Sequence, residues 1–314
     1  MLAGLADADF DAYLPAKQRS NVYNRERLEV KQRLLQLGRG LQPGLLGPDG
    51  APLDLAASVE HPALFNHKQV DAQHLYFARG EAARRELDAI IDRARGVASL
   101  LEDPTPQRSH VFLAISLYHD RLEVALRLHP EATVDRQNLT RKCQDPYELD
   151  RLASLLRALP DGWTVSLPPE GVGVAALERG ALEALLRRFA AATGPTLSPA
   201  LLSVARSWPR AEAIALGAGV ADVLSAGLAA LAPVYRFCAW ARDNDFVSVR
   251  EALAKQETER RQKGITRGDA VRVVRGLLSG QRGTVQEVDA RGALRVLVGK
   301  RTVKIDAGDV ERAG

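Results

Sequence analysis

The apolar residues of this chain change their spacing near residue 264, and that change limits the fold more than any other feature. Before it, apolar side chains recur every three or four residues, as at Val30, Leu34 and Leu37, which predicts a helix beginning near Asn24. After it, apolar and polar residues alternate, as in Val271, Arg272 and Val273, which is typical of strands. The sequence therefore predicts a helix-rich part followed by a small β part.

The longer part also contains strand signals, so we expect an α+β fold with one small antiparallel sheet. Its clearest signal is a hairpin over residues 110–129, in which two apolar runs flank a turn at His119 and Asp120. The spacing further predicts strands over 70–77 and 163–167. It predicts helices from residue 81, over 145–159 and over 174–192, and a helical block over 209–241.

In the last fifty residues, apolar side chains alternate with charged ones over four or five short segments. Closing such strands into a barrel hides their edges, so we expect a compact β-barrel there. Glycines suit its sharp corners, because they accept positive φ angles and close backbone approach. The glycines with this expected structural role are Gly268, Gly276, Gly280 and Gly283.

Two glycine-spaced motifs resemble a known family. They are Gly268-Asp269-x-Val271-Arg272-Val273-x-x-Gly276 and Gly280-x-x-Gly283-x-Val285-x-x-Val288-Asp289. Together they look like a KOW motif in an SH3-like barrel, closest in type to the C-terminal domain of NusG-type transcription elongation factors. The resemblance covers about 45 residues, from Arg267 to Glu311. It implies a module that binds RNA, ribosomal or transcription-complex partners.

The chain departs from that family where aromatic residues form its protein-partner surface. It has Leu277-Leu278 after the first turn glycine and Gly299-Lys300-Arg301 in the later loop. Charge is the binding feature that remains. Residues 250–314 contain 15 Lys/Arg and 9 Asp/Glu, a net of +6 in a chain of +4. The candidate binding residues are Arg272, Arg275, Arg282, Arg291, Arg295, Lys300, Arg301 and Lys304.

Such a basic surface favours RNA, DNA or a ribonucleoprotein as the partner, through phosphate contacts. Two alternatives stay open: a barrel that docks only on protein, and a solvated basic face with no partner. The expected organisation is an α+β domain over 1–245, a polar helical linker over 246–265 and the KOW-type barrel over 266–314.

The location of the protein is predicted from three features. The N-terminal residues carry acids and no basic region, unlike a signal peptide. Cys143 and Cys238 lie 95 positions apart and fit no disulfide framework or zinc spacing, which favours a reducing compartment. Residues 213–235 are long and apolar, but Asp222 and Pro233 favour a buried helix over a membrane span. We therefore expect a cytoplasmic protein without membrane contact.

Residues 1–245 carry no convincing catalytic motif. The six histidines lie between His61 and His129 but match no metal-binding spacing. Asp120 and Glu123 are acids without the lysine that a nuclease hairpin needs, and no local group activates Cys143. No glycine motif for a phosphate or dinucleotide occurs. The sequence thus predicts no metal, no cofactor and no catalytic residue.

These features favour a binding or regulatory protein of the transcription or translation machinery, with its C-terminal part on nucleic acid or ribonucleoprotein. The alternatives are a nucleic-acid-processing enzyme with its active site near the hairpin, and a protein-docking adaptor.

Overall fold

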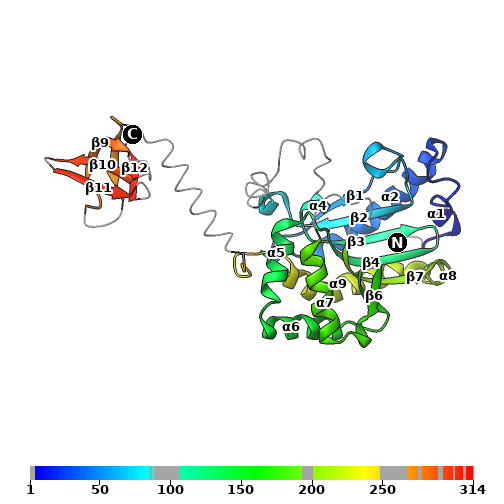
Figure 1. The fold of residues 1–314 in the computed structure, drawn as a ribbon. Helices are drawn as coiled ribbons and strands as arrows, with labels where there is room; N and C mark the ends of the chain where they lie inside the picture. The colour runs from blue at the N-terminus through cyan, green and yellow to red at the C-terminus, as the bar shows by residue number, and fades with distance from the viewer. Residues whose placement is uncertain are drawn as a thin grey trace. The chain divides into compact units, whose positions relative to one another are not determined.

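The computed structural model describes residues 4–84, 87, 106–192, 201–247, 267–274, 278–288, 293–299, 301–306 and 309–313. The chain divides into two compact units, Met1–Val247 and Ser248–Gly314 (Figure 1). Each unit is described by itself. Of the predicted linker, only Phe246 and Val247 are described, and they form a bend rather than a helix. The rest of that prediction lies outside the described residues.

The first unit combines helices with a sheet, which confirms the α+β class. Its α-helices are α1 (Asp7–Asp11), α2 (Asn24–Leu41), α4 (Pro106–Ser109), α5 (Thr133–Lys142), α6 (Pro146–Arg157), α7 (Arg179–Ala191), α8 (Arg210–Ala215) and α9 (Val220–Cys238). Short 3-10 turns occur at Asn21–Tyr23, Gln42–Gly44, Leu64–Asn66, Val174–Ala176 and Gly217–Gly219. The strands are β1 (Asp54–Ala57), β2 (Ala72–Ala78), β3 (Phe112–Tyr118), β4 (Arg121–Leu128), β5 (Trp163–Leu167), β6 (Glu170–Gly173) and β7 (Leu202–Pro209).

The seven strands form one antiparallel sheet in the order β1-β2-β3-β4-β7-β5-β6. The expected hairpin is present as β3 and β4, with His119 and Asp120 as its two-residue turn. The sheet is larger than the small one expected, because the sequence did not predict β1, β6 and β7. Strand β7 lies between β4 and β5, so it joins segments that are far apart in the sequence.

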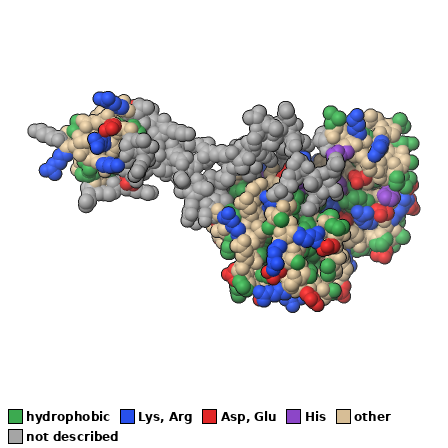
Figure 2. Space-filling view, in the orientation of Figure 1, with side chains coloured by type: hydrophobic (Ala, Val, Ile, Leu, Met, Phe, Trp, Pro, Cys, Tyr) green, Lys and Arg blue, Asp and Glu red, His purple; other side chains and the backbone are tan. Residues whose placement is uncertain are grey.

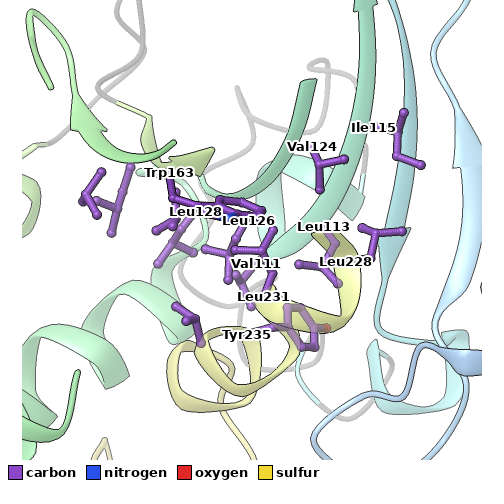
Figure 3. Packing of buried hydrophobic residues seen from close by; sticks show 14 of the residues in the cluster. Val111, Leu113, Ile115, Val124, Leu126, Leu128, Trp163, Leu228, Leu231 and Tyr235 are labelled. Carbon is purple, nitrogen blue, oxygen red and sulfur yellow. The ribbon is translucent and has the colours of Figure 1, made fainter. Parts of the chain in front are cut away.

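One face of the sheet is covered by helices and holds the core. Helices α2 and α9 pack on this face, against β1 and β2 and against β3 and β4 respectively. Figure 3 shows Leu228, Leu231 and Tyr235 of α9 beside Leu113 of β3 and Val111, which precedes that strand. The approach is close, since a Cβ atom at Gly227 would lie 3.4 Å from Val124 Cγ1.

Among the described helices, only the segment Gly217–Cys238 is long and apolar enough to cross a membrane by length and composition. Its buried side faces the sheet through Leu224, Leu228 and Leu231, and its exposed side includes Asp222 and Arg236. A helix that is buried against a sheet on one side and charged on the other is a core helix, as the sequence predicted.

A buried ion pair connects the end of the sheet to the helices. The Asp135 carboxylate on α5 is fully buried and accepts a hydrogen bond of 2.8 Å from Arg79 Nη2. It also accepts bonds from the backbone N–H groups of Val111 (2.8 Å) and Trp240 (2.7 Å). Four segments distant in sequence therefore meet at one side chain.

The second unit is a five-stranded antiparallel sheet. Its strands are β8 (Ala270–Val273), β9 (Arg282–Val288), β10 (Ala293–Val298), β11 (Arg301–Asp306) and β12 (Val310–Arg312), in the order β11-β10-β9-β8-β12. The alternating apolar residues make its core: Val271, Val273, Val285, Leu294, Val296, Ile305 and Val310. Leu278 packs against this core.

Three of the four expected structural glycines lie within the described residues. Gly268 and Gly280 have φ angles of +96° and +90°, which residues with a side chain rarely adopt. Gly283 is required for another reason, because a Cβ atom there would lie 2.5 Å from Val296 Cγ1 and 2.7 Å from the Leu297 carbonyl oxygen. Gly276 lies outside the described residues.

Candidate functional site

The described basic residues of the second unit lie exposed on its strands. Arg272 is on β8, Arg282 on β9, Arg295 on β10, and Arg301 and Lys304 on β11. Figure 2 shows Lys and Arg side chains projecting from the described surface of this unit, with fewer Asp and Glu side chains in view. The other predicted binding residues, Arg275, Arg291 and Lys300, lie outside the described part of the chain.

The strand register places like charges opposite one another. Arg272 pairs with Arg282 across β8 and β9, and Arg295 pairs with Lys304 across β10 and β11. Side chains in such positions have Cβ atoms about 5 Å apart, and like charges there destabilise the sheet. The strand pairing therefore places positive charges side by side at two positions, where their repulsion lowers the stability of the sheet.

Acidic neighbours offset this repulsion only in part. Arg295 Nη1 lies 3.3 Å from Glu287 Oε2, but the two side chains are 64% and 60% exposed. An exposed pair of this kind contributes about 0–1 kcal/mol. Glu311 lies opposite Arg272 in the ladder. Arg272, Arg282 and Arg295 are exposed and therefore accessible to an anionic ligand.

The second unit has no aromatic residues. Residues 248–314 contain no Phe, Trp or Tyr, so all 16 of these aromatic residues belong to the first unit. Stacking of bases on aromatic rings is the usual source of affinity for single strands, whereas phosphate contacts are indifferent to sequence. The second unit is therefore suited to phosphate contacts.

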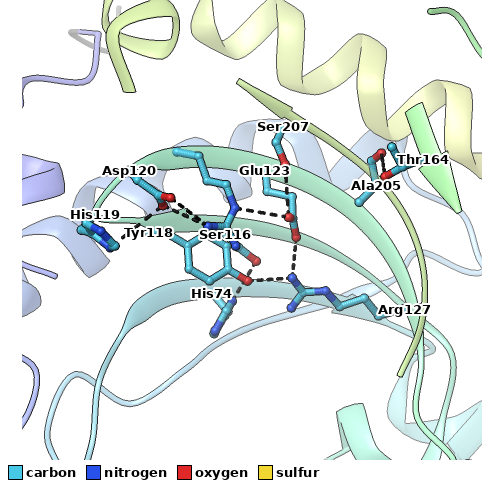
Figure 4. A network of polar contacts seen from close by, with 11 residues as sticks. His74, Ser116, Tyr118, His119, Asp120, Glu123, Arg127, Thr164, Ala205 and Ser207 are labelled. Atoms are coloured by element: carbon cyan, nitrogen blue, oxygen red, sulfur yellow. Dashed lines mark hydrogen bonds and ion pairs between the residues drawn. The ribbon is translucent and has the colours of Figure 1, made fainter. Parts of the chain in front are cut away.

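A polar network lies on the face of the first sheet opposite α2 and α9 (Figure 4). Arg127 on β4 donates to the Tyr118 hydroxyl at 2.8 Å and to the Glu123 carboxylate. Ser207 on β7 also donates to Glu123, at 3.2 Å, and Arg121 Nε lies 3.8 Å from the same carboxylate. We call this side of the sheet the network face.

Aromatic rings form a continuous chain across the network face. Phe112 meets the edge of Tyr76 at 5.6 Å between ring centroids, and Tyr76 stacks on His74 at 5.8 Å. His74 in turn meets Tyr118 edge-on at 5.8 Å. The Arg121 guanidinium completes the chain, with its Cζ atom 3.8 Å from the centre of the Tyr118 ring. These contacts hold the rings and the guanidinium in fixed orientations.

Burial sets the protonation states in the network. Burial, and secondarily the charge of Arg127, lower the pKa of His74 to about 3, so its ring is neutral. The His74 Nδ1 atom lies 2.8 Å from Ser116 Oγ. Burial disfavours the Arg127 cation, but Tyr118 and Glu123 outweigh it, so the pKa of Arg127 lies above its ordinary value. The network combines neutral rings with guanidinium groups that stay charged.

The sequence pattern did not predict this network, although part of the signal was present. Ser116, Tyr118, Glu123 and Arg127 share one side of the hairpin by the two-residue period. The contribution of His74 depends on the pairing of β2 with β3 across 42 residues, which spacing does not reveal.

Of the other described histidines, His119 reaches the edge of this network, with its Nδ1 atom 4.0 Å from Asp120 Oδ1 (Figure 4). His61 and His119 are 48% and 39% exposed, whereas His110 and His129 are buried beside Asp135 and Glu131 respectively. Within the described residues, no group of three or more His, Cys, Asp or Glu side chains is placed to hold a metal ion. Burial raises the pKa of Cys143 to about 12, which is unfavourable for a nucleophile.

Asp120 and Glu123, the acids considered for a nuclease site, are linked by Arg121. Its Nη1 donates to Asp120 Oδ1 at 2.9 Å, in addition to the approach of its Nε to Glu123. Both acids are therefore neutralised by a neighbouring cation, which suits a binding surface better than metal ligation. No family model and no curated protein matches the sequence.

Proposed function

We propose that the protein binds nucleic acid, free or in a ribonucleoprotein, through the exposed basic strands of its second unit. The observation that carries this proposal is the placement of Arg272 opposite Arg282, and of Arg295 opposite Lys304, on one small sheet. Cations packed at this density attract phosphates. The role that fits best is that of a binding or regulatory protein associated with transcription or translation.

We further propose that the five strands form an SH3-like barrel of the KOW type. The strand pairing supports this proposal. The last strand, β12, pairs with the first strand, β8, so the first and last segments of the unit lie next to each other, as they do in a small barrel. The positive φ angles at Gly268 and Gly280 also agree with the glycine positions of the KOW-like motifs.

Phosphate contacts have a measurable signature. Each neutralised phosphate of a duplex contributes about −0.9 to the slope of log affinity against log salt concentration. Four contacting cations give a slope of about −3.6, with little dependence on base sequence. A surface that docks only on protein binds no duplex and therefore shows no such slope in a duplex titration.

The test is charge reversal in the full chain. The double variant Arg272→Glu, Arg282→Glu is expected to lose most of its affinity for duplexes of unrelated sequence. The matched control, Arg25→Glu with Arg187→Glu, changes two residues of the first unit that are 91% and 74% exposed. The control is expected to bind like the wild type. Wild-type binding that ignores salt, or equal binding by the first double variant, overturns the proposal and favours a protein partner.

A further inference from the structure

We infer that the network face is a second contact site, which stacks an unpaired nucleobase on Arg121 and Tyr118 and so selects single strands over duplexes. This inference deepens the proposed function and rests on it. The second unit lacks aromatic residues, whereas the first unit has an arginine held on an aromatic ring of a sheet face.

The geometry provides a supported platform. The Arg121 guanidinium lies over the Tyr118 ring, and its side chain is 37% exposed. Tyr118 is fixed through its hydroxyl, which accepts from Arg127, and through its edge contact with His74. A guanidinium plane held in this way is a surface on which single-stranded bases stack.

The electrostatics favour a base over a phosphate at this site. The charges of Arg121 and Arg127 are balanced by those of Asp120 and Glu123, through their hydrogen bonds and ion pairs. The neighbouring His74 ring is neutral because burial lowers its pKa to about 3. A site that is polar yet balanced complements a neutral, planar, hydrogen-bonding group, while the basic strands of the second unit complement the phosphates.

In the adjacent row of the network face, Ala114 and Ala125 lie opposite one another on β3 and β4 but are fully buried, so the accessible neighbour of the platform is on β7. Beside Glu123, Ser207 is exposed and carries a hydroxyl group that is able to bond the edge of a base.

Duplex bases do not fit such a platform. Their faces are covered by neighbouring bases and their edges are paired, so stacking on a protein side chain requires an unpaired base. The site therefore predicts that the protein prefers single strands to duplexes. This preference does not depend on the phosphate contacts of the second unit, which are sensitive to salt.

The experiment compares the affinities of the full chain for two kinds of labelled probe. One is a 12-nucleotide single strand, used as oligouridine and as oligothymidine, and the other is a duplex of equal length. Arg121→Lys keeps the charge but removes the planar group. It is expected to lower single-strand affinity about 5-fold or more, the lower end of the effect of losing one stacked base. Its duplex affinity and salt slope are expected to equal those of the wild type. Arg187→Lys, on a residue that is 74% exposed on α7, is the matched control.

A second pair of variants tests whether the Tyr118 ring, rather than its hydroxyl group, supports the platform. Tyr118→Phe keeps the ring that supports the guanidinium, so it is expected to retain most of the single-strand preference. Tyr118→Leu is expected to lose it. A wild-type protein with no preference for single strands overturns the inference. An unchanged preference in Arg121→Lys overturns it as well. In both cases, duplex binding that weakens with salt leaves the proposed function intact. Absence of salt-dependent binding to both probes instead overturns the proposed function.

Discussion

The buried carboxylate of Asp135 allows a direct test of what stabilises the first unit. This carboxylate is fully buried and accepts from Arg79 Nη2 and from two backbone N–H groups, those of Val111 and Trp240. Asp135→Asn removes the charge and leaves the guanidinium of Arg79 buried without its counterion. Breaking a buried pair on one side costs about 3–5 kcal/mol. We expect the free energy of unfolding of this unit to fall by that amount.

The assay is urea unfolding of the full chain, followed by tryptophan fluorescence. All three tryptophans lie in residues 1–247, so the signal reports on the first unit alone. Asp150→Asn is the control, because Asp150 is 54% exposed and its pair with Arg179 is worth about 0–1 kcal/mol. Adding Arg79→Met to Asp135→Asn is expected to restore part of the stability, since no uncompensated charge then remains. A decrease below about 1 kcal/mol for Asp135→Asn would mean that the ion pair does not hold these segments together.

Three further outcomes follow from the structure. Because burial lowers the pKa of His74 to about 3, only the unfolded chain takes up this proton as the pH falls from 6.5 to 5. The contribution of His74 to stability then decreases by up to about 1.4 kcal/mol per pH unit, and His74→Gln is expected to reduce the pH dependence in urea unfolding. The remaining dependence comes from His129, because burial also lowers its pKa, to about 4. Gly283→Ala places a methyl group against Val296 and the Leu297 carbonyl, so hydrogen exchange in β9 and β10 is expected to accelerate, whereas Thr284→Ala, at an exposed position, leaves it unchanged. Cys143, whose pKa is raised to about 12 by burial, is expected to react with a thiol reagent only after urea unfolds the first unit; rapid labelling of the native protein contradicts its buried position.

Elements with strong local signals were predicted from the sequence. Helix α2 begins at Asn24 as expected, and the Asp145 side chain caps α6 by accepting from the backbone N–H of Tyr147. The hairpin of β3 and β4 follows from two apolar runs around a short turn. In each case neighbouring residues determine the structure, so spacing and capping residues suffice.

Elements that depend on distant partners were missed. Strand β7 is stabilised by β4 and β5, and the sequence pattern predicts a helix from its last residue, Pro209. The helical block itself is confirmed as α8 and α9, but it begins one residue later, because Pro209 ends the strand and directly precedes α8. The predicted helix over 174–192 begins only at Arg179, after the short strand β6 and a 3-10 turn.

The two candidate sites also differ in whether local sequence or distant strands determine them. The alternation of charged and apolar residues predicted which side of the second unit is basic, and the structure adds that the cations face one another across strands. The network face depends on β2, β3, β4 and β7 coming together, so no local pattern defined it.

Phosphate binding by the second unit is tested most simply by how duplex affinity varies with salt in the wild type and in Arg272→Ala, Arg282→Ala. If both arginines bind phosphates, the slope of log affinity against log salt becomes shallower by about 1.8 in the double variant, because each phosphate that is no longer neutralised removes about 0.9. Parallel lines for the two proteins would contradict the proposed function, because the paired arginines of β8 and β9 would then bind no phosphate.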